Sequence, residues 1–210
     1  MMRGLYLVTD RGLCAKRPLE DVVIQAVKGG AAYVQLREKD TATRSFVDEA
    51  RKIKNLLDPY KVPLIINDRI DVALACGAEG VHIGQEDMPY FIARKLMGQK
   101  AIIGLSVETW EDVVTSQQLD VDYIGVSPLF ATPTKTDTKG EWGLEGLARI
   151  KAFSRHPLVA IGGINESNTR DVVRAGADCV AVVSAICSAA NPGEAAAAIN
   201  GIINSALMER

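Results

Sequence analysis

Short apolar runs recur along the whole chain and alternate with longer segments of mixed composition. Each run is rich in Val and Ile and is nearly continuous, instead of alternating between apolar and polar positions. This pattern is typical of strands that are buried on both faces, as in a parallel sheet. It predicts eight buried strands, which are LYLVT, AAYVQL, PLIIN, GVHIG, AIIGLS, DYIGVS, LVAIGG and CVAVVS.

The longer segments between the runs have the spacing of amphipathic helices. In two of them the apolar residues fall on one stripe, which we expect to pack against the strands. Glycines follow the periodic segments at Gly29, Gly77, Gly98 and Gly176, as is typical of helix C-termini. The predicted stripes are Val22, Val23, Ala26 and Val27 in the first segment, and Phe46, Ala50, Ile53 and Leu57 in the second.

Similar phrases precede alternate strands. KGGAAYVQLR, ACGAEGVHIG and RAGADCVAVV share a glycine, an alanine, two variable residues and then the strand. An eightfold alternation of buried strand and amphipathic helix predicts an α/β fold, a (β/α)8 TIM barrel, in which residues 1–210 form a single domain. The alternative is a doubly wound open sheet, whose dinucleotide-binding form would carry GxGxxG after the first strand. LVTDRGLC stands there instead, which favours the barrel.

The composition narrows the class of protein. The formal net charge is -2 and aromatic residues make up 5% of the chain, which argues against a nucleic-acid partner. No apolar stretch approaches the roughly 18 residues of a membrane span, and the N-terminal apolar run is too short for a signal peptide. The four cysteines form no CxxC pair. We therefore expect a cytoplasmic protein with reduced cysteines, no zinc site and no membrane partner.

Polar residues and glycines follow every predicted strand. In a (β/α)8 barrel the active site lies where the strands end and the βα loops begin, so these residues are the candidates for a ligand site. The turns from helix to strand have no such bias. The strand-end residues are Thr9, Asp10, Gln35, Arg37, Lys39, Asn67, Asp68, Gln85, Asp87, Ser106, Ser127, Gly162, Gly163 and Ser184.

The strand ends favour a bound anion. Arg37, Lys39 and Lys135 are cations able to face the barrel mouth, and guanidinium groups bind phosphate oxygens well. Gly162 and Gly163 let the backbone approach an anion closely, and we expect a helix to begin within 164–168 and add its positive N-terminus. Hydroxyl donors stand nearby at Ser106, Thr132 and Thr134. Any one of these lysines alone is most simply a solvated surface residue, but together they predict a phosphate site.

Two carboxylates stand at the ends of the third and fourth predicted strands, Asp68 and Asp87. They could merely form salt bridges with the cations. As metal ligands they fit Mg²⁺, which takes one or two carboxylates, waters and substrate phosphate oxygens. One metal ion and three cations suit a diphosphate. His82 is expected to be a hydrogen-bonded barrel residue and His156 a surface residue, so the site has little acid–base equipment.

The motifs closely resemble those of the thiamine-phosphate synthase family. The matching segments are YLVTD, QLREKD, INDR, GVHIGQEDMP, IGLSV, DYIGVSPLFATPTKTD, AIGGI and CVAVVSAI, which span almost the whole chain. The resemblance implies a transferase of thiamine biosynthesis that condenses hydroxymethylpyrimidine diphosphate with thiazole phosphate and releases diphosphate. It also implies Mg²⁺ as cofactor, small-molecule substrates, and a dissociative step in which an electron-rich aminopyrimidine stabilises a cation.

The resemblance assigns roles to particular residues. It implies that Asp68 and Asp87 hold Mg²⁺. We add the hypothesis that Lys135 neutralises charge on the departing diphosphate. Arg37, Lys39 and Ser106 are the further catalytic candidates. The implied pyrimidine diphosphate contacts are Gln35, Leu36, Arg37, Glu38, Lys39, Asn67, Ser106 and Lys135, and the implied thiazole phosphate contacts are Thr132, Pro133, Thr134, Gly163, Val183 and Ser184.

Two other functions remain open from the sequence. A related thiazole tautomerase would have no diphosphate to bind and would not need the full set of cations and aspartates. A non-catalytic phosphate sensor on the same scaffold should have lost a metal carboxylate, and Asp68 and Asp87 are both present. The sequence therefore favours the synthase, and it leaves the oligomeric state open.

Overall fold

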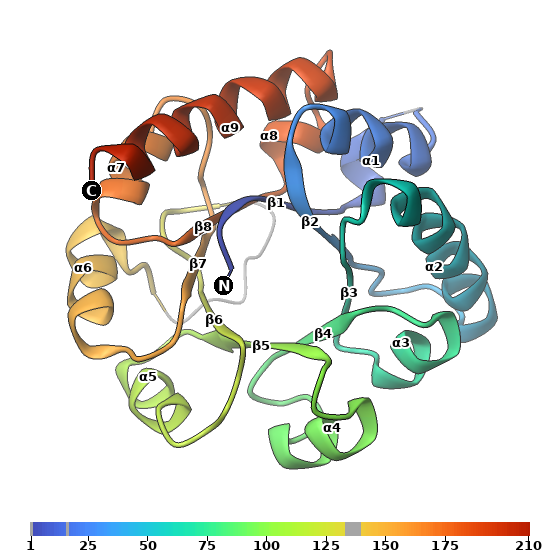
Figure 1. Ribbon diagram of the computed structural model, residues 1–210, viewed down its shortest axis with the longest axis horizontal. Coiled ribbons are helices and arrows are strands. Elements are labelled where there is room, and N and C mark those ends of the chain that lie inside the picture. Colours follow the sequence, from blue (N-terminus) through green and yellow to red (C-terminus); the bar gives the residue numbers. More distant parts are fainter. Residues whose placement is uncertain (1, 16, 133–139) are drawn as a thin grey trace.

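The computed structural model describes residues 2–15, 17–132 and 140–210. Within them, eight parallel strands close into a barrel, with each strand paired to the next and the last paired to the first. Figure 1 looks down this barrel and shows the helices as an outer ring. The predicted (β/α)8 fold is confirmed, and the open-sheet alternative is wrong. The strands are β1 (Gly4–Val8), β2 (Ala31–Leu36), β3 (Leu64–Asn67), β4 (Gly80–Ile83), β5 (Ile102–Val107), β6 (Tyr123–Val126), β7 (Leu158–Ile161) and β8 (Cys179–Val182).

Helices alternate with the strands along the chain. In the described part of the chain, β8 is followed by two helices, a short one and then the long helix that completes the outer ring. The α-helices are α1 (Leu19–Lys28), α2 (Thr43–Leu57), α3 (Ile70–Cys76), α4 (Tyr90–Met97), α5 (Trp110–Ser116), α6 (Gly143–Phe153), α7 (Thr169–Arg174), α8 (Ser184–Cys187) and α9 (Pro192–Met208). Two 3-10 helices are η1 (Arg11–Cys14) and η2 (Asp58–Tyr60).

Apolar side chains form two layers, because successive residues of a strand point to opposite faces. The outer layer lies between strands and helices, and it includes both predicted helical stripes, whose residues are all buried. The inner layer fills the barrel itself. Its buried members are Met2, Tyr6, Val8, Ile65, Tyr123, Val159, Cys179 and Ala181. The inner layer forms the floor on which a site at the strand ends can rest.

The helix expected to begin within 164–168 begins later, at Thr169. Side-chain hydrogen bonds hold a turn in its place. Asn165 N donates to Asn168 Oδ1 at 2.9 Å, and Ser167 N donates to Asn165 Oδ1 at 2.9 Å. Asn and Ser compete with helical hydrogen bonding in this way. The helix therefore begins one residue later than expected, with Asn168 as its N-cap, and a turn separates it from Gly163.

His156 is also placed differently from the prediction. It is 6% exposed, and its Nε2 lies 2.9 Å from the carbonyl oxygen of Ser116. Burial lowers the pKa of His156 below its usual value. The RHP turn folds this ring under α5, so it is a structural residue of the outer layer.

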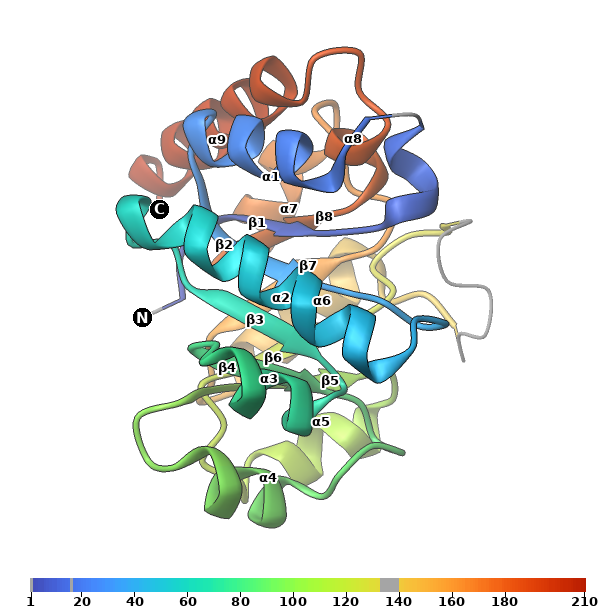
Figure 2. The same ribbon diagram turned by 90° about the vertical axis from the view of Figure 1, so that its right-hand side faces the viewer.

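The two ends of the barrel differ in character. In Figure 2 the strands run from the N-terminus on the left toward the βα loops on the right. The chain leaves β2 and β3 on the right, and the helix-to-strand turns and the end of α9 lie on the left. The strand-end residues of the sequence therefore gather at one end of the molecule, as expected for this fold.

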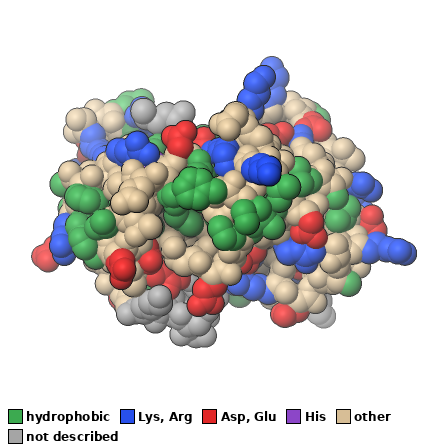
Figure 3. Space-filling model, turned by 90° about the horizontal axis from the view of Figure 1, so that it is seen from below, with side chains coloured by type: hydrophobic (Ala, Val, Ile, Leu, Met, Phe, Trp, Pro, Cys, Tyr) green, Lys and Arg blue, Asp and Glu red, His purple; other side chains and the backbone are tan. Residues whose placement is uncertain are grey.

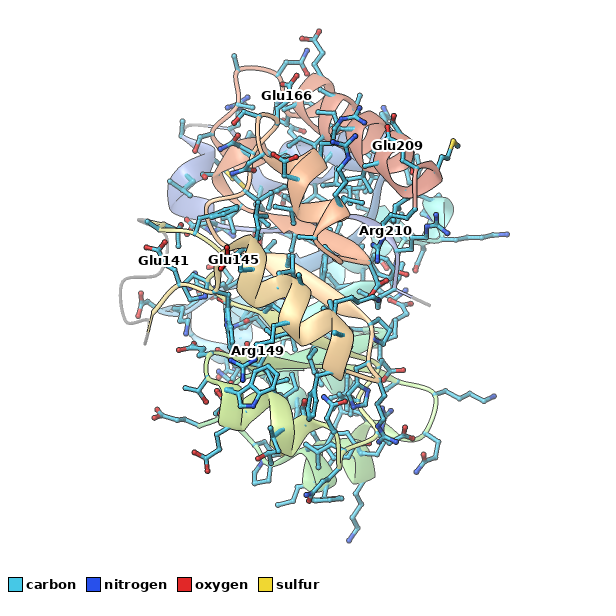
Figure 4. The ribbon with its side chains drawn as sticks, turned by 90° about the vertical axis from the view of Figure 1, so that its left-hand side faces the viewer. Glu141, Glu145, Arg149, Glu166, Glu209 and Arg210 are labelled. Carbon is cyan, nitrogen blue, oxygen red and sulfur yellow. The ribbon has the colours of Figure 1, made fainter. Side chains whose placement is uncertain are left out.

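The outer helices are tied to one another by charged side chains. Figure 4 shows Arg149 of α6 reaching toward α5, where its guanidinium lies 3.8 Å from the centre of the Trp110 ring. Glu209, just past α9, accepts from Arg174 Nη2 of α7 at 2.8 Å. These contacts lie on the flank of the barrel and not at the strand ends.

One helix has an apolar outer side. Figure 3 shows hydrophobic side chains gathered on the face around α4, where Phe91 is 71% exposed and Ile92 and Leu96 are about half exposed. The same helix buries Tyr90 and Ala93 toward the barrel. Among the described residues, no helix is both long and apolar enough to cross a membrane.

Candidate active site at the mouth of the barrel

A cavity of about 360 Å³ opens at the strand ends and reaches down to the inner layer. It brings together residues that follow seven different strands, and most of the predicted site lines it. Of the strand-end candidates, Thr9 and Asp10 are not in its wall. The predicted residues in its wall are Gln35, Arg37, Lys39, Asn67, Asp68, Gln85, Asp87, Ser106, Ser127, Thr132, Gly162, Gly163, Val183 and Ser184. Their common location is what the barrel geometry predicts.

The pleat of β2 divides the QLREK segment between two environments. Gln35 points into the barrel and lines the cavity, where it is 5% exposed. Leu36 points the other way and is fully buried in the outer layer. The described cavity wall therefore includes Gln35 and not Leu36. The Leu36 side chain therefore does not face the cavity, and the predicted pyrimidine contact through it is not supported.

Arg37 and Lys39 extend from the end of β2 over the mouth of the cavity. The backbone N–H of Arg37 donates to Thr9 Oγ1 at 3.0 Å, which fixes the chain as it leaves the strand. Arg37 Nη1 lies 3.8 Å from Asp10 Oδ2, and Lys39 Nζ lies 3.7 Å from Asp68 Oδ2. These separations are loose for ion pairs, so both cations can turn toward an incoming anion.

Glu38 lies between these cations in sequence but does not line the cavity. Its Oε2 accepts from Thr41 Oγ1 at 2.9 Å, and its Oε1 lies 3.3 Å from Arg11 Nε. That Oε1 is buried and accepts no hydrogen bond from the described residues. The carboxylate is thus turned toward η1, so its charge balances Arg11 and leaves Arg37 and Lys39 unopposed by it.

The two predicted metal carboxylates meet at the mouth. Burial raises the pKa of Asp68 to about 6, and the neighbouring Asp87 carboxylate adds to the rise. Asp87 is held by the N–H of Gly84, which donates to its Oδ2 at 2.6 Å. Asp68 adopts a left-handed backbone with φ 62°, a strained conformation that is concentrated at functional sites. Its N–H donates to the carbonyl oxygen of His82 at 2.8 Å, which holds it there.

The carboxylate pair suits a cation. Two acidic groups this close destabilise each other's charged forms, and a proton or a metal ion relieves that repulsion. Among the described residues no third His, Cys, Asp or Glu joins them to complete a protein cage. Two carboxylates with open positions are the donor set that Mg²⁺ takes when substrate phosphates supply further oxygens.

Ser106 and Asn67 stand deeper in the cavity. Ser106, on β5, is half-buried, and its Oγ lies 2.8 Å from His82 Nε2. His82 is hydrogen-bonded within the barrel, which confirms its prediction. Asn67 ends β3 and is 9% exposed, with its Cα paired to that of His82 on β4. These groups offer a hydroxyl and an amide to the buried end of a ligand.

Glycines shape the opposite wall. Gly163 has φ 65°, and a Cβ there would lie 2.7 Å from the carbonyl oxygen of Ala131. The loop after β6 thus packs directly on the backbone after β7, which requires glycine. Thr132, Val183 and Ser184 lie in the same wall, and Ser184 opens α8. The remaining predicted residues of this region, Pro133, Thr134 and Lys135, lie outside the described residues.

Sequence reasoning missed several cavity residues. Tyr6 and Tyr123 reach the cavity floor from β1 and β6, and Glu108 and Asp112 lie at its rim. Each tyrosine stands inside an apolar strand, where it resembles core. A usable signal was the inward pleat position that Tyr6 shares with Val8, because a hydroxyl inside a barrel must find a partner.

Comparisons with known proteins agree with this arrangement. Residues 5–186 match the family model described as thiamine monophosphate synthase. Similar proteins include a thiamine-phosphate synthase of Albidiferax ferrireducens, 57% identical with 96% of this chain and 92% of that one covered. Another, from Leptospira biflexa, is 54% identical over 94% of this chain and 96% of its own.

A solved structure titled thiamine phosphate pyrophosphorylase, from Pyrococcus furiosus, superimposes with a TM-score of 0.89. It is 36% identical in sequence, and the match covers 97% of this chain and 96% of that one. The resemblance found in the motifs is thus confirmed over nearly the full length. The chain belongs to the thiamine monophosphate synthase family.

Proposed function

We propose that this chain condenses a pyrimidine methyl diphosphate with a thiazole phosphate at the mouth of its barrel, giving thiamine phosphate and diphosphate. Membership of the family supports the reaction. The observation that carries it to this site is that two cations, Arg37 and Lys39, share one cavity with the carboxylate pair Asp68 and Asp87. A monophosphate alone would not need that much charge.

The diphosphate lies, in this proposal, at the rim between the ends of β2 and β4. Arg37 and Lys39 bind its oxygens, since neither cation is held by a close carboxylate contact. The pyrimidine ring lies below it, beside Gln35, Asn67 and Ser106, whose side chains are largely withdrawn from solvent. Buried polar groups of this kind orient a ring through hydrogen bonds to its nitrogen atoms.

Asp68 and Asp87 would hold Mg²⁺ against the same diphosphate. The raised pKa of Asp68 supports this assignment, because the site disfavours two uncompensated carboxylates. When bound, the metal ion would neutralise negative charge on the leaving diphosphate. The same carboxylates would hold the ion beside Lys39, whose Nζ lies 3.7 Å from Asp68 Oδ2.

The thiazole phosphate is assigned to the wall opposite the carboxylates. The backbone at Gly163 and the start of α8 at Ser184 face the cavity there, together with Thr132. Backbone N–H groups at a glycine turn suit phosphate oxygens. Pro133, Thr134 and Lys135 remain proposed contacts from the family resemblance.

The family resemblance implies a dissociative course for this reaction, and we assign that course to the present site. The C–O bond to diphosphate breaks, the aminopyrimidine stabilises the cation, and the thiazole nitrogen donates its electron pair to the methylene carbon. The cations bind the charge that develops on the leaving group. The depth of the cavity keeps water from the cation.

The test is release of diphosphate by the purified chain with both substrates and Mg²⁺, with and without EDTA. Metal-dependent release that requires both substrates, with thiamine phosphate formed in equal amount, is the expected result. Release without thiamine phosphate would overturn the condensation. Binding without any turnover would favour a sensor, and isomerisation of a thiazole carboxylate phosphate would favour the tautomerase. A cytoplasmic location and a single domain remain predictions.

A further inference from the structure

A continuous chain of hydrogen bonds crosses the floor of the cavity from β2 to β5. Gln35 Nε2 donates to Tyr6 Oη at 3.0 Å, and Tyr6 Oη lies 3.1 Å from Tyr123 Oη. Tyr123 Oη lies 3.0 Å from His82 Nδ1, and His82 Nε2 lies 2.8 Å from Ser106 Oγ. All five members line the cavity, and Gln35 and Ser106 form the two ends of this network. Its middle members thus connect two groups that face the ligand.

The two tyrosines in the middle of this network are shielded from solvent. Tyr6 is 1% exposed and Tyr123 is fully buried. Burial raises the pKa of both phenols, so both keep their protons at any pH near neutrality. The chain is therefore built from neutral hydroxyls, each with one hydrogen to donate.

Two glycines leave space for the rings of this hydrogen-bond network. A Cβ at Gly104 would lie 2.1 Å from Tyr123 Cζ, and a Cβ at Gly125 would lie 2.9 Å from His82 Cε1. The two glycines lie on neighbouring strands, where Gly104 is paired in register with both His82 and Tyr123, and Gly125 is paired with Ser106. Because no other residue type fits, the barrel interior is shaped around these two rings.

The hydrogen bonds of this network all run in one direction, each group accepting from one neighbour and donating to the next. Tyr6 Oη accepts from Gln35, and among the described residues its own hydrogen can reach only Tyr123 Oη. Tyr123 Oη then accepts from Tyr6, so its hydrogen goes to His82 Nδ1. His82 must in turn carry its proton on Nε2 and donate to Ser106 Oγ. Ser106 is left with its own hydrogen, which points to the ligand.

The reverse direction requires a change at both ends at once. Ser106 would donate to His82 Nε2, His82 Nδ1 to Tyr123, and Tyr123 to Tyr6. Tyr6 would then donate to Gln35, whose amide would have to turn its oxygen inward. A mixed direction would leave a buried hydroxyl hydrogen without an acceptor, which costs about 1–3 kcal/mol. The ends are therefore coupled.

We propose that Tyr6, Tyr123 and His82 are positioning residues that fix Ser106 as a hydrogen-bond donor and the amide oxygen of Gln35 as an acceptor toward the ligand. This pair of groups matches a ring that offers an acceptor nitrogen beside an amino donor, and it disfavours the corresponding oxo ring, which offers the opposite pattern. The choice of an aminopyrimidine rests on the proposed function, whereas the direction of the chain does not.

The same geometry argues against Ser106 as a nucleophile activated by His82. A serine and a histidine at 2.8 Å resemble such a pair, in which a third group accepts from the other ring nitrogen. Here the third group, Tyr123, donates to His82 Nδ1. His82 therefore presents a proton to Ser106 and has no lone pair with which to remove one.

The first test measures the tautomer of His82 by ¹⁵N NMR in the substrate-free chain. The chain has only two histidines, so a His156→Gln variant assigns the signals. We expect the proton on Nε2 at neutral pH. A proton on Nδ1, or on both nitrogens, would overturn the proposal whether or not the chain makes thiamine phosphate.

The second test removes single hydroxyls at constant ring shape. Tyr123→Phe and Tyr6→Phe should each lower kcat/KM for the pyrimidine diphosphate at least about tenfold and leave the KM for thiazole phosphate unchanged. Preference for the amino over the oxo pyrimidine should fall by a similar factor. In Tyr123→Phe the His82 signal should shift toward a mixture of tautomers.

Tyr33→Phe is the matched control. The Tyr33 ring packs against Tyr6 with centroids 5.6 Å apart, but its hydroxyl takes no part in the chain. It should retain normal kinetics and the amino preference. If Tyr123→Phe and Tyr6→Phe behave like Tyr33→Phe, the positioning role is wrong. If Tyr123→Phe does not fold, Tyr6→Phe and the tautomer measurement still decide.

Discussion

Lys39 Nζ lies 3.7 Å from Asp68 Oδ2, so the cation that follows β2 stands beside the carboxylate that follows β3. The side chain of Lys39 is 54% exposed and the contact is long, so this pair contributes little to stability. Its location instead allows Lys39 to move between Asp68 and a bound diphosphate. The pair therefore belongs to the candidate active site, and its loss should lower the rate of catalysis.

Lys39→Ala should lower kcat by about 10²–10³-fold, as removal of one charge-stabilising group does in other active sites. The melting temperature should change little, because the Lys39 side chain is exposed and its contact with Asp68 is long. Steady-state kinetics and thermal unfolding of the same preparation measure both effects. Lys95→Ala, at an exposed position of α4, is the control and should change neither. Equal kinetics in the two variants would remove Lys39 from the mechanism.

Asp68→Asn should have a pH-dependent effect on stability. An acid whose pKa is raised by folding favours the folded state at low pH and loses that contribution as the pH rises through its folded value. For Asp68 that value is about 6. Without Mg²⁺, the melting temperature of the variant relative to wild type should therefore rise between pH 5 and pH 7.5. Added Mg²⁺ at the higher pH should stabilise wild type more than the variant, because wild type has both carboxylates for the ion and the variant keeps only Asp87.

Asp71→Asn is the matched control for that experiment. Hydrogen bonding to Arg69 lowers the pKa of Asp71 below its usual value. Its contribution is thus lost only at more acidic pH, so the difference from wild type should stay flat over the same range. A flat difference for Asp68→Asn as well would show that its carboxyl is not perturbed.

Gly163→Ala should weaken binding of the thiazole phosphate and destabilise the fold. The left-handed φ of 65° and the 2.7 Å approach to Ala131 both oppose a side chain. We expect a loss of about 1–3 kcal/mol in unfolding free energy. Gly201→Ala tests the opposite case, because Gly201 lies in α9 with nothing within 4 Å of an added Cβ. It should stabilise the chain by up to about 1 kcal/mol. Denaturant titration compares the two.

Glu38→Gln tests whether every residue of the QLREK motif contacts the substrate. The Glu38 carboxylate contacts Arg11 and Thr41 and does not line the cavity. The variant should therefore keep its KM for the pyrimidine diphosphate within about twofold while losing some stability, because a partly buried ion pair is broken. A large rise in KM would mean that Glu38 turns to the ligand during the reaction.

Much of the fold follows from the sequence. Nearly continuous apolar runs mark buried parallel strands, and the eight runs predicted all contain strands within a residue or two of their limits. Helix stripes are equally clear, since the period of 3.6 residues separates buried from exposed positions. The failures are local. Asn165 redirects a predicted helix into a turn, and the turn around His156 folds inward because its ring finds a carbonyl partner.

The site is predictable as a set of strand ends but not in its detail. A motif such as QLREK names adjacent residues, whereas the pleat sends Gln35 inward and Leu36 outward. Glu38 pairs with Arg11, a residue outside the segments that match the family. The tyrosines of the cavity floor escaped notice because a strand tyrosine is read as core until its partners are known.

The pairing of β1 with β8 joins Leu5 to Val180, from opposite ends of the chain. Contacts between such distant segments form late in folding, because closing a long loop costs entropy before these contacts can stabilise the fold. The substrate cavity draws on strands from both halves, so it comes into being together with this closure. Substrate binding should therefore stabilise the closed barrel. A protein cut into two fragments between two barrel units should reassemble more readily when the pyrimidine diphosphate is present than when it is absent.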